Sequence, residues 1–417
     1  MTAAQPSPVQ PSLVRFGALS LTYFAAIGLF NPYAPLWFQS LGFSTLVIGG
    51  IASLQSWTRV FAPYAWSWFG DHSGRRVELI RLSAAGALLS ALGLVFAGTG
   101  VDAAVPVAAV VAFMFIANSG VVPLSEATLA HLLHTADGVD PGRYGRVRMW
   151  GSIGFIAAVT SFGALLEWGG IAIFPAFVAV MNAWLLVAAL RLPATREDAQ
   201  HDAPAPPVLP LLRRPDVAWF FASVFFTVLA HTSLYAFFSL YLVSLGYGKA
   251  AVGALWAVSV AVEIVFFAMQ GRWYRWLTAH GWLQAAAVMT ALRFVAIAAG
   301  GAWLPVLVVA QMAHALTFAA HHAACISLVQ RHFPGRLRGR GQALYTTLGY
   351  GLSGVLGGVG GGWLISHLGF AAVFWAAAGC AVLASGCVAL SARAAARAAT
   401  QASASASVAV AASSRLE

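Results

Sequence analysis

The stretch DVAWFFASVFFTVLAHTSLYAFFSLYLVS, residues 216–244, has one acidic residue at its start and no Lys or Arg. About 20 apolar residues cross the hydrocarbon core of a bilayer as a helix, so this stretch is long enough to span it. Similar runs recur throughout the 417 residues, of which 60% are hydrophobic and 9% charged, against roughly 25% charged residues in a soluble domain. So few charges cannot cover a surface that faces water. The sequence therefore predicts a membrane protein that crosses the bilayer many times.

Twelve apolar windows, bounded by Arg, Gly, Pro or acidic clusters, predict twelve transmembrane helices. They are too long and too uniformly apolar to be the alternating strands of an outer-membrane barrel. The fold class is therefore expected to be all-α. The predicted spans cover residues 14–38, 46–68, 78–98, 105–133, 147–166, 171–191, 216–244, 250–270, 283–301, 304–330, 341–366 and 370–391.

The positive charges predict the orientation of these helices. With the N-terminus in the cytoplasm, all but three of the 23 Lys and Arg residues fall on the cytoplasmic side. The exceptions are Lys249 on the opposite side, and Arg59 and Arg293 inside spans. Because short cytoplasmic loops of membrane proteins are enriched in Lys and Arg, both termini are expected in the cytoplasm. The net charge of +10 is then a consequence of topology, and no nucleic-acid partner is expected.

The chain divides into two halves that repeat. The tetrapeptide Ser40-Leu41-Gly42-Phe43 recurs 204 residues later as Ser244-Leu245-Gly246-Tyr247, and Gly49 matches Gly253 at the same offset. Parallel repeats of this kind are typical of transporters built from two related bundles. This predicts a cytoplasmic N-terminal tail at 1–13, an N-terminal six-helix bundle at 14–191, a cytoplasmic linker at 192–215, a C-terminal six-helix bundle at 216–391 and a disordered cytoplasmic tail at 392–417.

Ionisable residues inside the spans are candidate functional residues. Each costs about 2.5–3.5 kcal/mol on insertion scales, so such residues face a bundle interior or a wet cavity. Arg59 and Glu263 have opposite charges and lie 204 residues apart, at pseudo-equivalent positions of the repeat. Trp256 shares the helical face of Glu263. We expect this face to line a central cavity; a structural Arg59–Glu263 pair that only fixes helix packing is the alternative.

The ninth span carries Arg293, and the tenth carries His314, His321 and His322. In an uninterrupted α-helix His314 and His321 share a face, and His322 is rotated from it by about 100°. Metal-binding frames such as H-x-x-x-H and H-E-x-x-H are absent from the sequence, and so is the phosphate-binding motif of ATPases. No metal, cofactor or enzymatic activity is expected, and the proton gradient is the expected driving force.

A charged loop follows the second span, with the sequence Asp71-His72-Ser73-Gly74-Arg75-Arg76. It resembles the loop signature of the major facilitator superfamily, a glycine followed by D-R/K-x-G-R-R, with Ser67 and His72 as departures. The charges predict a gating latch of Asp71, Arg75 and Arg76 at the cytoplasmic ends of the helices. The alternative is an ordinary loop made basic by topology.

A second stretch, Arg143-Tyr144-Gly145-Arg146-Val147-Arg148-Met149-Trp150-Gly151-Ser152, looks like the start of the fifth helix in the phenylpropionate permease family. This bacterial family of major facilitators is related to the lactose permease. The similarity covers most of residues 15–391, and it continues through His231, Tyr235, Glu263, Arg293, His314 and His322. The fold it implies is two pseudo-symmetric six-helix bundles in the bacterial inner (cell) membrane.

This resemblance implies roles for individual residues. Glu126 and Arg148 match the substrate-binding Glu and Arg of the lactose permease, although Arg148 has the alternative of snorkelling to the membrane interface. His322 matches a histidine of the proton machinery. The proton-carrying carboxylate that should follow it is replaced by Cys325. Its task is then expected to fall to Glu263, Glu126 or a histidine.

The charges inside the spans suggest the cargo. Arg59, Arg148 and Arg293 exceed Glu126 and Glu263 by one positive charge, which a monocarboxylate would neutralise.

The predicted substrate site comprises Arg59, Glu126, Arg148, His231, Tyr235, Trp256 and Arg293, and the proton-coupling residues are Glu263, His322 and Glu126. The predicted function is proton-coupled symport of a small aromatic carboxylate by a monomer. Alternatives are proton-linked transport of a neutral sugar or nucleoside, proton-driven efflux and, from another class, a membrane sensor or integral membrane enzyme.

Overall fold

The computed structural model describes residues 9–135, 138–139, 141–193, 208–334 and 337–413. Part of the predicted N-terminal tail (1–8) and most of the predicted linker (194–207) lie outside these residues. The first half of the chain forms α1 (Val9–Ser40), α2 (Thr45–Ser73), α3 (Arg76–Val95), α4 (Ala104–Asn118), α5 (Val121–Leu132), the paired strands β1 (His134–Thr135) and β2 (Gly138–Val139), α6 (Pro141–Gly169) and α7 (Phe174–Leu190).

The second half contains two long helices that change their hydrogen-bonding pattern midway. In each, a π-helical segment joins two α-helical segments. The elements are α8 (Leu209–Leu212), α9 (Pro215–Ser244), α10 (Lys249–Trp273), α11 (Ala279–Gly300), α12 (Leu304–Met312), the π-helix Ala315–Ala320, α13 (His321–His332), α14 (Arg338–Leu344), the π-helix Tyr345–Leu352, α15 (Ser353–Leu368) and α16 (Phe370–Ser413).

The expected all-α membrane fold is confirmed. In the described residues, 11 helices are long and apolar enough to cross a membrane. The remaining predicted span corresponds to α2, which has 29 residues and is long enough to cross. Its hydropathy is lowered by Gln55 and Arg59, two residues that prove to line the interior of the protein.

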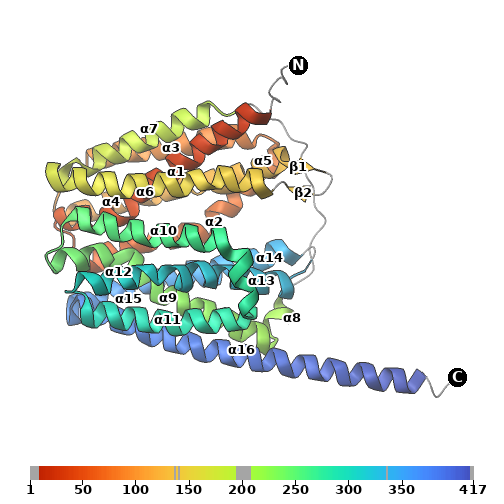
Figure 1. The fold of residues 1–417 in the computed structure, drawn as a ribbon. Coiled ribbons are helices and arrows are strands. Elements are labelled where there is room, and N and C mark those ends of the chain that lie inside the picture. The colour runs from red at the N-terminus through yellow and green to blue at the C-terminus, as the bar shows by residue number, and fades with distance from the viewer. Residues whose placement is uncertain (1–8, 136–137, 140, 194–207, 335–336, 414–417) are drawn as a thin grey trace, which may run out of the picture.

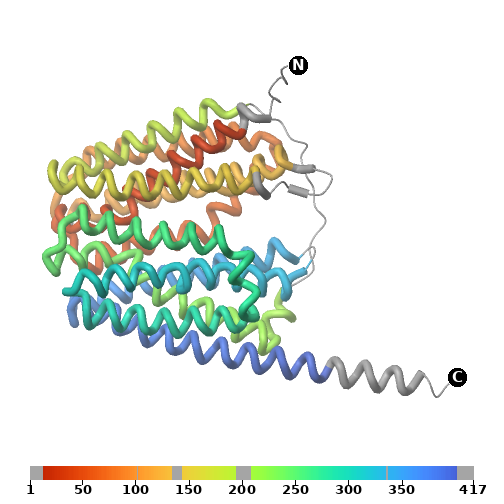
Figure 2. The backbone as a smooth tube through the Cα atoms, viewed as in Figure 1, coloured from red at the N-terminus to blue at the C-terminus, as the bar shows by residue number. Residues whose placement is uncertain are grey.

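The helices gather into two groups that run in roughly parallel directions (Figure 1). In the first group α1 packs against α6 and α7, and α3 packs against α4 and α7. In the second group α9 and α11 pack against α16. Figure 2 shows the same division as a change from red and yellow to green and blue along the chain.

The repeated tetrapeptide folds in the same way in both halves. Gly42 and Gly246 have φ angles of 87° and 89°, in the left-handed region that glycine adopts without strain. The amide of Phe43 donates to the carbonyl of Phe38, and the amide of Tyr247 donates to that of Leu242. These two bonds are also 204 residues apart, so the sequence repeat is a repeat of structure.

The two halves meet through two pseudo-equivalent helix pairs, α2 with α15 and α6 with α10. A Cβ atom built on Gly49 of α2 would lie 2.1 Å from the carbonyl oxygen of Gly358, and one on Gly253 of α10 would lie 2.3 Å from that of Val159. Both distances are too short for a contact between a Cβ atom and a backbone oxygen, so only glycine fits at these two positions. The glycine pair at offset 204 therefore permits close backbone contact between the halves.

Side chains add bonds between the halves near Lys249. The hydroxyl of Tyr33 on α1 shares its one proton between the carbonyl of Val159 on α6, at 2.6 Å, and the carbonyl of Lys249 on α10 in the other half, at 3.3 Å. The carboxylate of Glu167, at the end of α6, accepts a hydrogen bond from the backbone amide of Lys249. We call this side of the molecule the Lys249 end; here the halves are joined.

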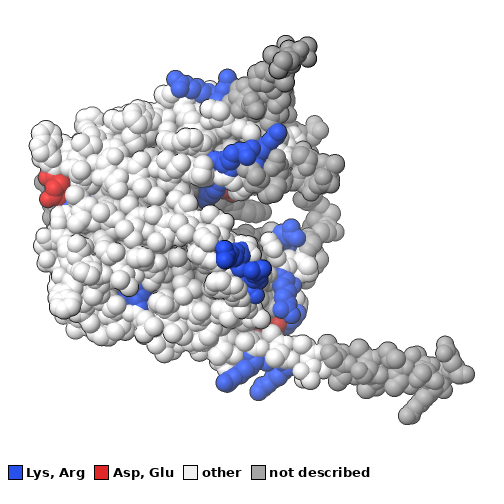
Figure 3. Space-filling view, in the orientation of Figure 1, with Lys and Arg blue, Asp and Glu red and all other residues white. Residues whose placement is uncertain are grey.

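The opposite side, the arginine-rich end, carries most of the basic residues. Figure 3 shows Lys and Arg gathered there and the surface hollowed between the two halves. Among them, Arg81 of α3 donates to the carbonyl of Leu192, just beyond α7, at 2.8 Å. The halves are thus in contact at the Lys249 end and separated at the arginine-rich end.

The predicted disordered tail differs in the structure. Within residues 392–417, α16 continues to Ser413 and extends beyond the other helices (Figure 1). The reason is composition, because alanine has the highest helix propensity and this segment is rich in it. Residues 414–417 lie outside the described part.

We expect Gly49→Leu to separate α2 from α15 and to open the Lys249 end. A cysteine at Ala52 of α2, three residues after Gly49, lines the interior. It should then react about tenfold faster with a thiol reagent confined to the Lys249 side, as expected if the closed state loses ~1.4 kcal/mol. The native cysteines are replaced beforehand. Gly50→Leu is the control, since a Cβ there meets nothing within 4 Å. Equal labelling in the two variants would contradict the role of Gly49.

Candidate functional site

A chamber between the two halves consists of three adjoining compartments. The aromatic compartment has a volume of about 650 Å³, the polar compartment about 500 Å³ and the junction compartment about 290 Å³. Asn31 of α1 lines all three, which shows that they adjoin. A drug-sized or smaller ligand fits a chamber of this size.

Both halves contribute to the aromatic compartment. Its rings and charged groups come from six helices, and its wall consists of Phe24, Ile27, Asn31, Glu126, Tyr144, Arg148, Ser152, Phe155, Tyr235, Trp256, Ser259, Val260, Glu263, Phe267, His314, Phe318 and His322. Of the predicted site residues, it therefore brings together Glu126, Arg148, Tyr235, Trp256, Glu263 and His322.

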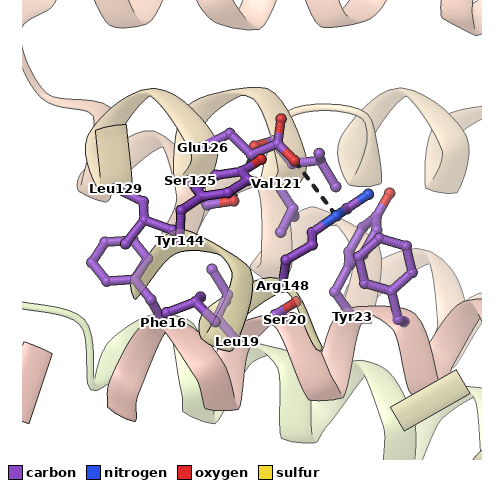
Figure 4. A pocket seen from close by; sticks show the side chains of 13 residues that line it. Phe16, Leu19, Ser20, Tyr23, Val121, Ser125, Glu126, Leu129, Tyr144 and Arg148 are labelled. Atoms are coloured by element: carbon purple, nitrogen blue, oxygen red, sulfur yellow. Dashed lines mark hydrogen bonds and ion pairs between the residues drawn. The ribbon is translucent and has the colours of Figure 1, made fainter. Parts of the chain in front are cut away.

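Glu126 and Arg148 form an ion pair inside the chamber. Nη1 of Arg148 lies 3.5 Å from Oε1 of Glu126, and the side chains are 48% and 41% exposed. The guanidinium also lies 4.7 Å from the ring centre of Phe24. Figure 4 shows the pair above a small cavity formed by α1, α5 and α6. Arg148 thus points to its acidic partner, in contrast to the snorkelling alternative.

A buried chain of polar groups lies behind Glu263. Arg293, 2% exposed, donates to Oγ1 of Thr317 at 2.9 Å, to Oε1 of Gln311 at 2.5 Å and to Nδ1 of His314 at 3.1 Å. A guanidinium has donors only, so Nδ1 of His314 must accept and the ring proton must sit on Nε2. Nε2 lies 3.7 Å from the carboxylate of Glu263. Arg293 therefore orients the histidine toward Glu263.

Two predicted substrate-binding residues do not line the chamber. Arg293 is occupied by the bonds just described, and His231 is 4% exposed. Nδ1 of His231 lies 2.8 Å from the carbonyl oxygen of Thr227, and its ring packs edge-on against Phe294. Neither residue lines any of the three compartments. They stand one layer behind the wall, because a buried charge or imidazole needs fixed partners that the neighbouring helices supply.

The predicted face of the tenth span was wrong. His314, Phe318 and His322 form the stacked row: the ring centres are 4.9 Å apart in the first pair and 6.2 Å in the second, with interplanar angles of 4° and 10°. His321 is buried beside Cys325, whose Sγ lies 3.5 Å from its Nε2. The π-helix Ala315–Ala320 explains this, because a π-turn inserts one residue and brings His322 to the position expected for His321.

His314, which was not among the predicted proton-coupling residues, therefore contacts Glu263 directly. His322 instead has Nδ1 3.1 Å from the hydroxyl of Tyr345, which lies 3.2 Å from that of Tyr350. The two histidines have separate surroundings: His314 joins the charged groups, and His322 joins two tyrosines.

Arg59 is the charged residue without a partner. It lines the polar and junction compartments. Among the described residues no ion pair or side-chain hydrogen bond involves it, and the carboxylate of Glu263 lies 3.7 Å from Nε2 of His314. The structural Arg59–Glu263 pair considered from the sequence is therefore not formed. Arg59 leaves one uncompensated positive charge facing the chamber.

Tyr235 and Trp256 form an aromatic wall. Their ring centres are 6.1 Å apart at an interplanar angle of 24°, and both line the aromatic compartment. Nε1 of Trp256 donates to Oγ of Ser239 at 3.4 Å, which fixes the indole. Together with the row of His314, Phe318 and His322, this wall offers flat surfaces on which a planar ligand can stack.

The predicted gating residues lie at the arginine-rich end. Asp71, at the end of α2, accepts a hydrogen bond of 2.7 Å from Arg76 at the start of α3. Arg75, which immediately precedes α3, lies 3.5 Å from Glu78 in the first turn of that helix. The loop therefore ties α2 to α3 within one half, and its role in gating stays a prediction. In the described residues no group of three His, Cys, Asp or Glu side chains is placed to hold a metal ion.

Sequence reasoning missed Asn31 and Gln55, which both line two or more compartments. Two sequence signals point to them. Gln55 precedes Arg59 by four residues and so shares its helical face. Asn31 is followed by Pro32 and Pro35 within α1, and prolines inside a membrane helix locally disturb its backbone hydrogen bonds.

The chain is similar to known transporters. The model of the MFS_1 like family matches residues 13–376. A probable 3-phenylpropionic acid transporter of Escherichia coli (strain K12) is 28% identical over 364 residues, which are 85% of this chain and 91% of that protein. A maltose permease of Geobacillus stearothermophilus is also 28% identical over 364 residues, 84% of this chain and 87% of the permease.

Solved structures share the fold. The nucleoside transporter NupG superposes with a TM-score of 0.77 over 91% of this chain and 98% of NupG, at 18% identity. At this identity the likeness concerns the arrangement of helices.

We expect Arg293→Met to destabilise the protein and Arg59→Met to leave its stability unchanged or raise it. Loss of Arg293 leaves buried acceptors unpaired, which costs about 1–3 kcal/mol of stability. The midpoint of thermal unfolding in detergent should therefore fall by roughly 5 °C. Arg59 has no partner to lose, and its removal relieves the cost of a charge at membrane depth. Similar losses in both variants would show that Arg59 is also a structural residue.

Proposed function

The chain belongs to the MFS_1 like family, a family of multi-pass membrane transporters and not of enzymes, and from this premise we propose that it is a proton-coupled symporter. Its cargo is a small aromatic carboxylate, taken up across the bacterial inner membrane. The transporter acts as a monomer with both termini in the cytoplasm, and the proton gradient replaces any cofactor.

The observation that carries this proposal is the unpaired Arg59 in a chamber whose other charges are balanced. Arg148 is neutralised by Glu126, and Arg293 is linked through His314 to Glu263. One positive charge remains, and a monocarboxylate is the simplest ligand that neutralises it. A guanidinium binds a carboxylate through two parallel hydrogen bonds.

The residues that line the chamber are an argument for an aromatic cargo. Tyr235 and Trp256 on one side and Phe318 with two histidines on the other are flat groups around a cavity of about 650 Å³. Stacking of an aromatic ring on such a group contributes about 0.5–1.5 kcal/mol in addition to the free energy gained by burying its surface. A relative named as a probable 3-phenylpropionic acid transporter supports the same class of cargo.

Glu263 is the proposed proton carrier. It faces the chamber with 24% of its side chain exposed, and Nε2–H of His314 points to it. An anion arriving in the chamber adds negative charge and so favours protonation of Glu263, which links cargo and proton.

Alternating access follows from contacts at the Lys249 end. The halves join there through Gly49, Gly253 and the contact of Tyr33 with Lys249, and are separate at the arginine-rich end. Rocking of the halves would break these contacts and form new ones at the other end, around the same chamber. In the proposed orientation, the separated arginine-rich end faces the cytoplasm.

Arg59→Gln is expected to weaken binding of 3-phenylpropionate about 10–100-fold, the loss of ~1.5–3 kcal/mol for a charge-assisted hydrogen bond. The neutral 3-phenylpropionamide should lose little, because it places no charge on Arg59. Calorimetry on purified protein measures both, with Arg393→Gln on the extended part of α16 as the control. Equal losses for acid and amide would favour the alternative of a neutral sugar or nucleoside.

Glu263→Gln is expected to abolish accumulation driven by an imposed pH gradient and to preserve exchange of labelled for unlabelled substrate. The amide keeps the size of the side chain but cannot carry the proton. Transport into vesicles measures both activities, with the exposed Glu78→Gln as the control. Accumulation that persists in Glu263→Gln would exclude this carboxylate as carrier, and accumulation in the outward direction would identify an exporter.

A further inference from the structure

Three polar side chains gather where the polar and junction compartments meet. The residues that line both compartments are Phe30, Asn31, Gln55, Arg59 and Phe115. The two phenylalanines contact each other edge to face, with ring centres 5.6 Å apart. The boundary is thus an apolar frame around one guanidinium and two amides.

The two amides have no protein partner. In the described part of the chain, no hydrogen bond is formed by the side chains of Asn31, Gln55 or Arg59, and their polar atoms are not among the fully buried ones. Two hydroxyl groups of the polar compartment are engaged: Thr58 donates to the Gln55 carbonyl and Ser119 to the Ile116 carbonyl. The side-chain amides of Asn118 and Gln342 in the polar compartment also form no hydrogen bond in the described part of the chain. Asn31, Gln55 and Arg59 differ from them because they line both compartments.

The backbone favours this arrangement. Gln55 and Arg59 are four residues apart on α2, so their side chains are neighbours on one face of the helix. Pro35 has no N–H, and it therefore cannot donate the helical hydrogen bond to the carbonyl of Asn31. This break in the ladder of α1 occurs at the one residue that lines all three compartments.

The other arginines are occupied. Arg148 has its charge matched by Glu126 and its face covered by Phe24. Arg293 is buried among Gln311, Thr317 and His314. Of the three arginines within the spans, only Arg59 both lines the chamber and has no ion-pair or hydrogen-bond partner among the described residues.

We propose that Gln55 and Asn31 complete the carboxylate subsite with Arg59 and determine the specificity for an anion. This inference rests on the proposed function and assigns its carboxylate to one place. The guanidinium takes two lone pairs of the carboxylate, and the amide N–H groups of Gln55 and Asn31 donate to the lone pairs that remain. Tyr235 and Phe318, which line both the junction and the aromatic compartments, receive the attached ring.

Gln55→Glu tests the subsite. The new carboxylate is four residues before Arg59, in the orientation that forms ion pairs on a helix, and it takes the place of the cargo. Affinity for 3-phenylpropionate should fall about 30-fold or more, and affinity for 3-phenylpropionamide should change by less than about threefold. Gln270→Glu is the matched control, since Gln270 lines none of the three compartments.

Gln55→Leu and Asn31→Leu are the second pair of variants. Each removes one donor without adding charge, and each should weaken the acid about five- to tenfold, as expected for a hydrogen bond to a charged group. Binding of the amide and the midpoint of thermal unfolding show that each variant is folded. Specific loss of the acid supports the subsite.

The outcomes separate this inference from the proposed function. If Arg59→Gln loses the acid but Gln55→Glu, Gln55→Leu and Asn31→Leu bind it as tightly as the parent, the subsite is overturned and the carboxylate transporter stands. Equal loss of acid and amide in these variants also overturns it, because it indicates general disturbance of the chamber. If the parent binds neither compound, both proposals are overturned together.

Discussion

The hydrocarbon interior of a bilayer cannot solvate a charge, and this constraint organises the protein. Arg59, Glu126, Arg148, Glu263 and Arg293 lie within the membrane-spanning helices, and none is left facing lipid without compensation. Four line a common chamber, and the fifth is held by three buried acceptors. Since such groups are costly elsewhere, the two bundles must enclose a polar space between them.

That space has a graded composition. At one side an ion pair, Glu126–Arg148, is partly exposed and therefore adjustable, and at the other Arg293 and His314 form a rigid support behind Glu263. Arg59 lines the adjoining polar and junction compartments and has no ion-pair partner among the described residues.

Close backbone contact at the Lys249 end and separation at the other end derive from the internal repeat. Gly49 and Gly253 occupy equivalent positions, and each meets a backbone carbonyl of the opposite half. The helix pairs concerned, α2 with α15 and α10 with α6, are also equivalent under the repeat. A duplicated sequence thus gives two similar contacts between the halves.

The sequence by itself determined the all-α fold, the repeat and the presence of charged residues in the spans, because these depend on hydropathy and on the cost of charge in lipid. Tertiary structure alone decided which charges pair: Arg148 points to Glu126, His314 rather than His322 contacts Glu263, and Arg293 and His231 stand behind the wall. Helical periodicity could not predict the row of His314, Phe318 and His322, since one π-turn rotates every later residue. Nor could it find Asn31 and Gln55, whose importance comes from the packing of α1 against α2 around a shared space.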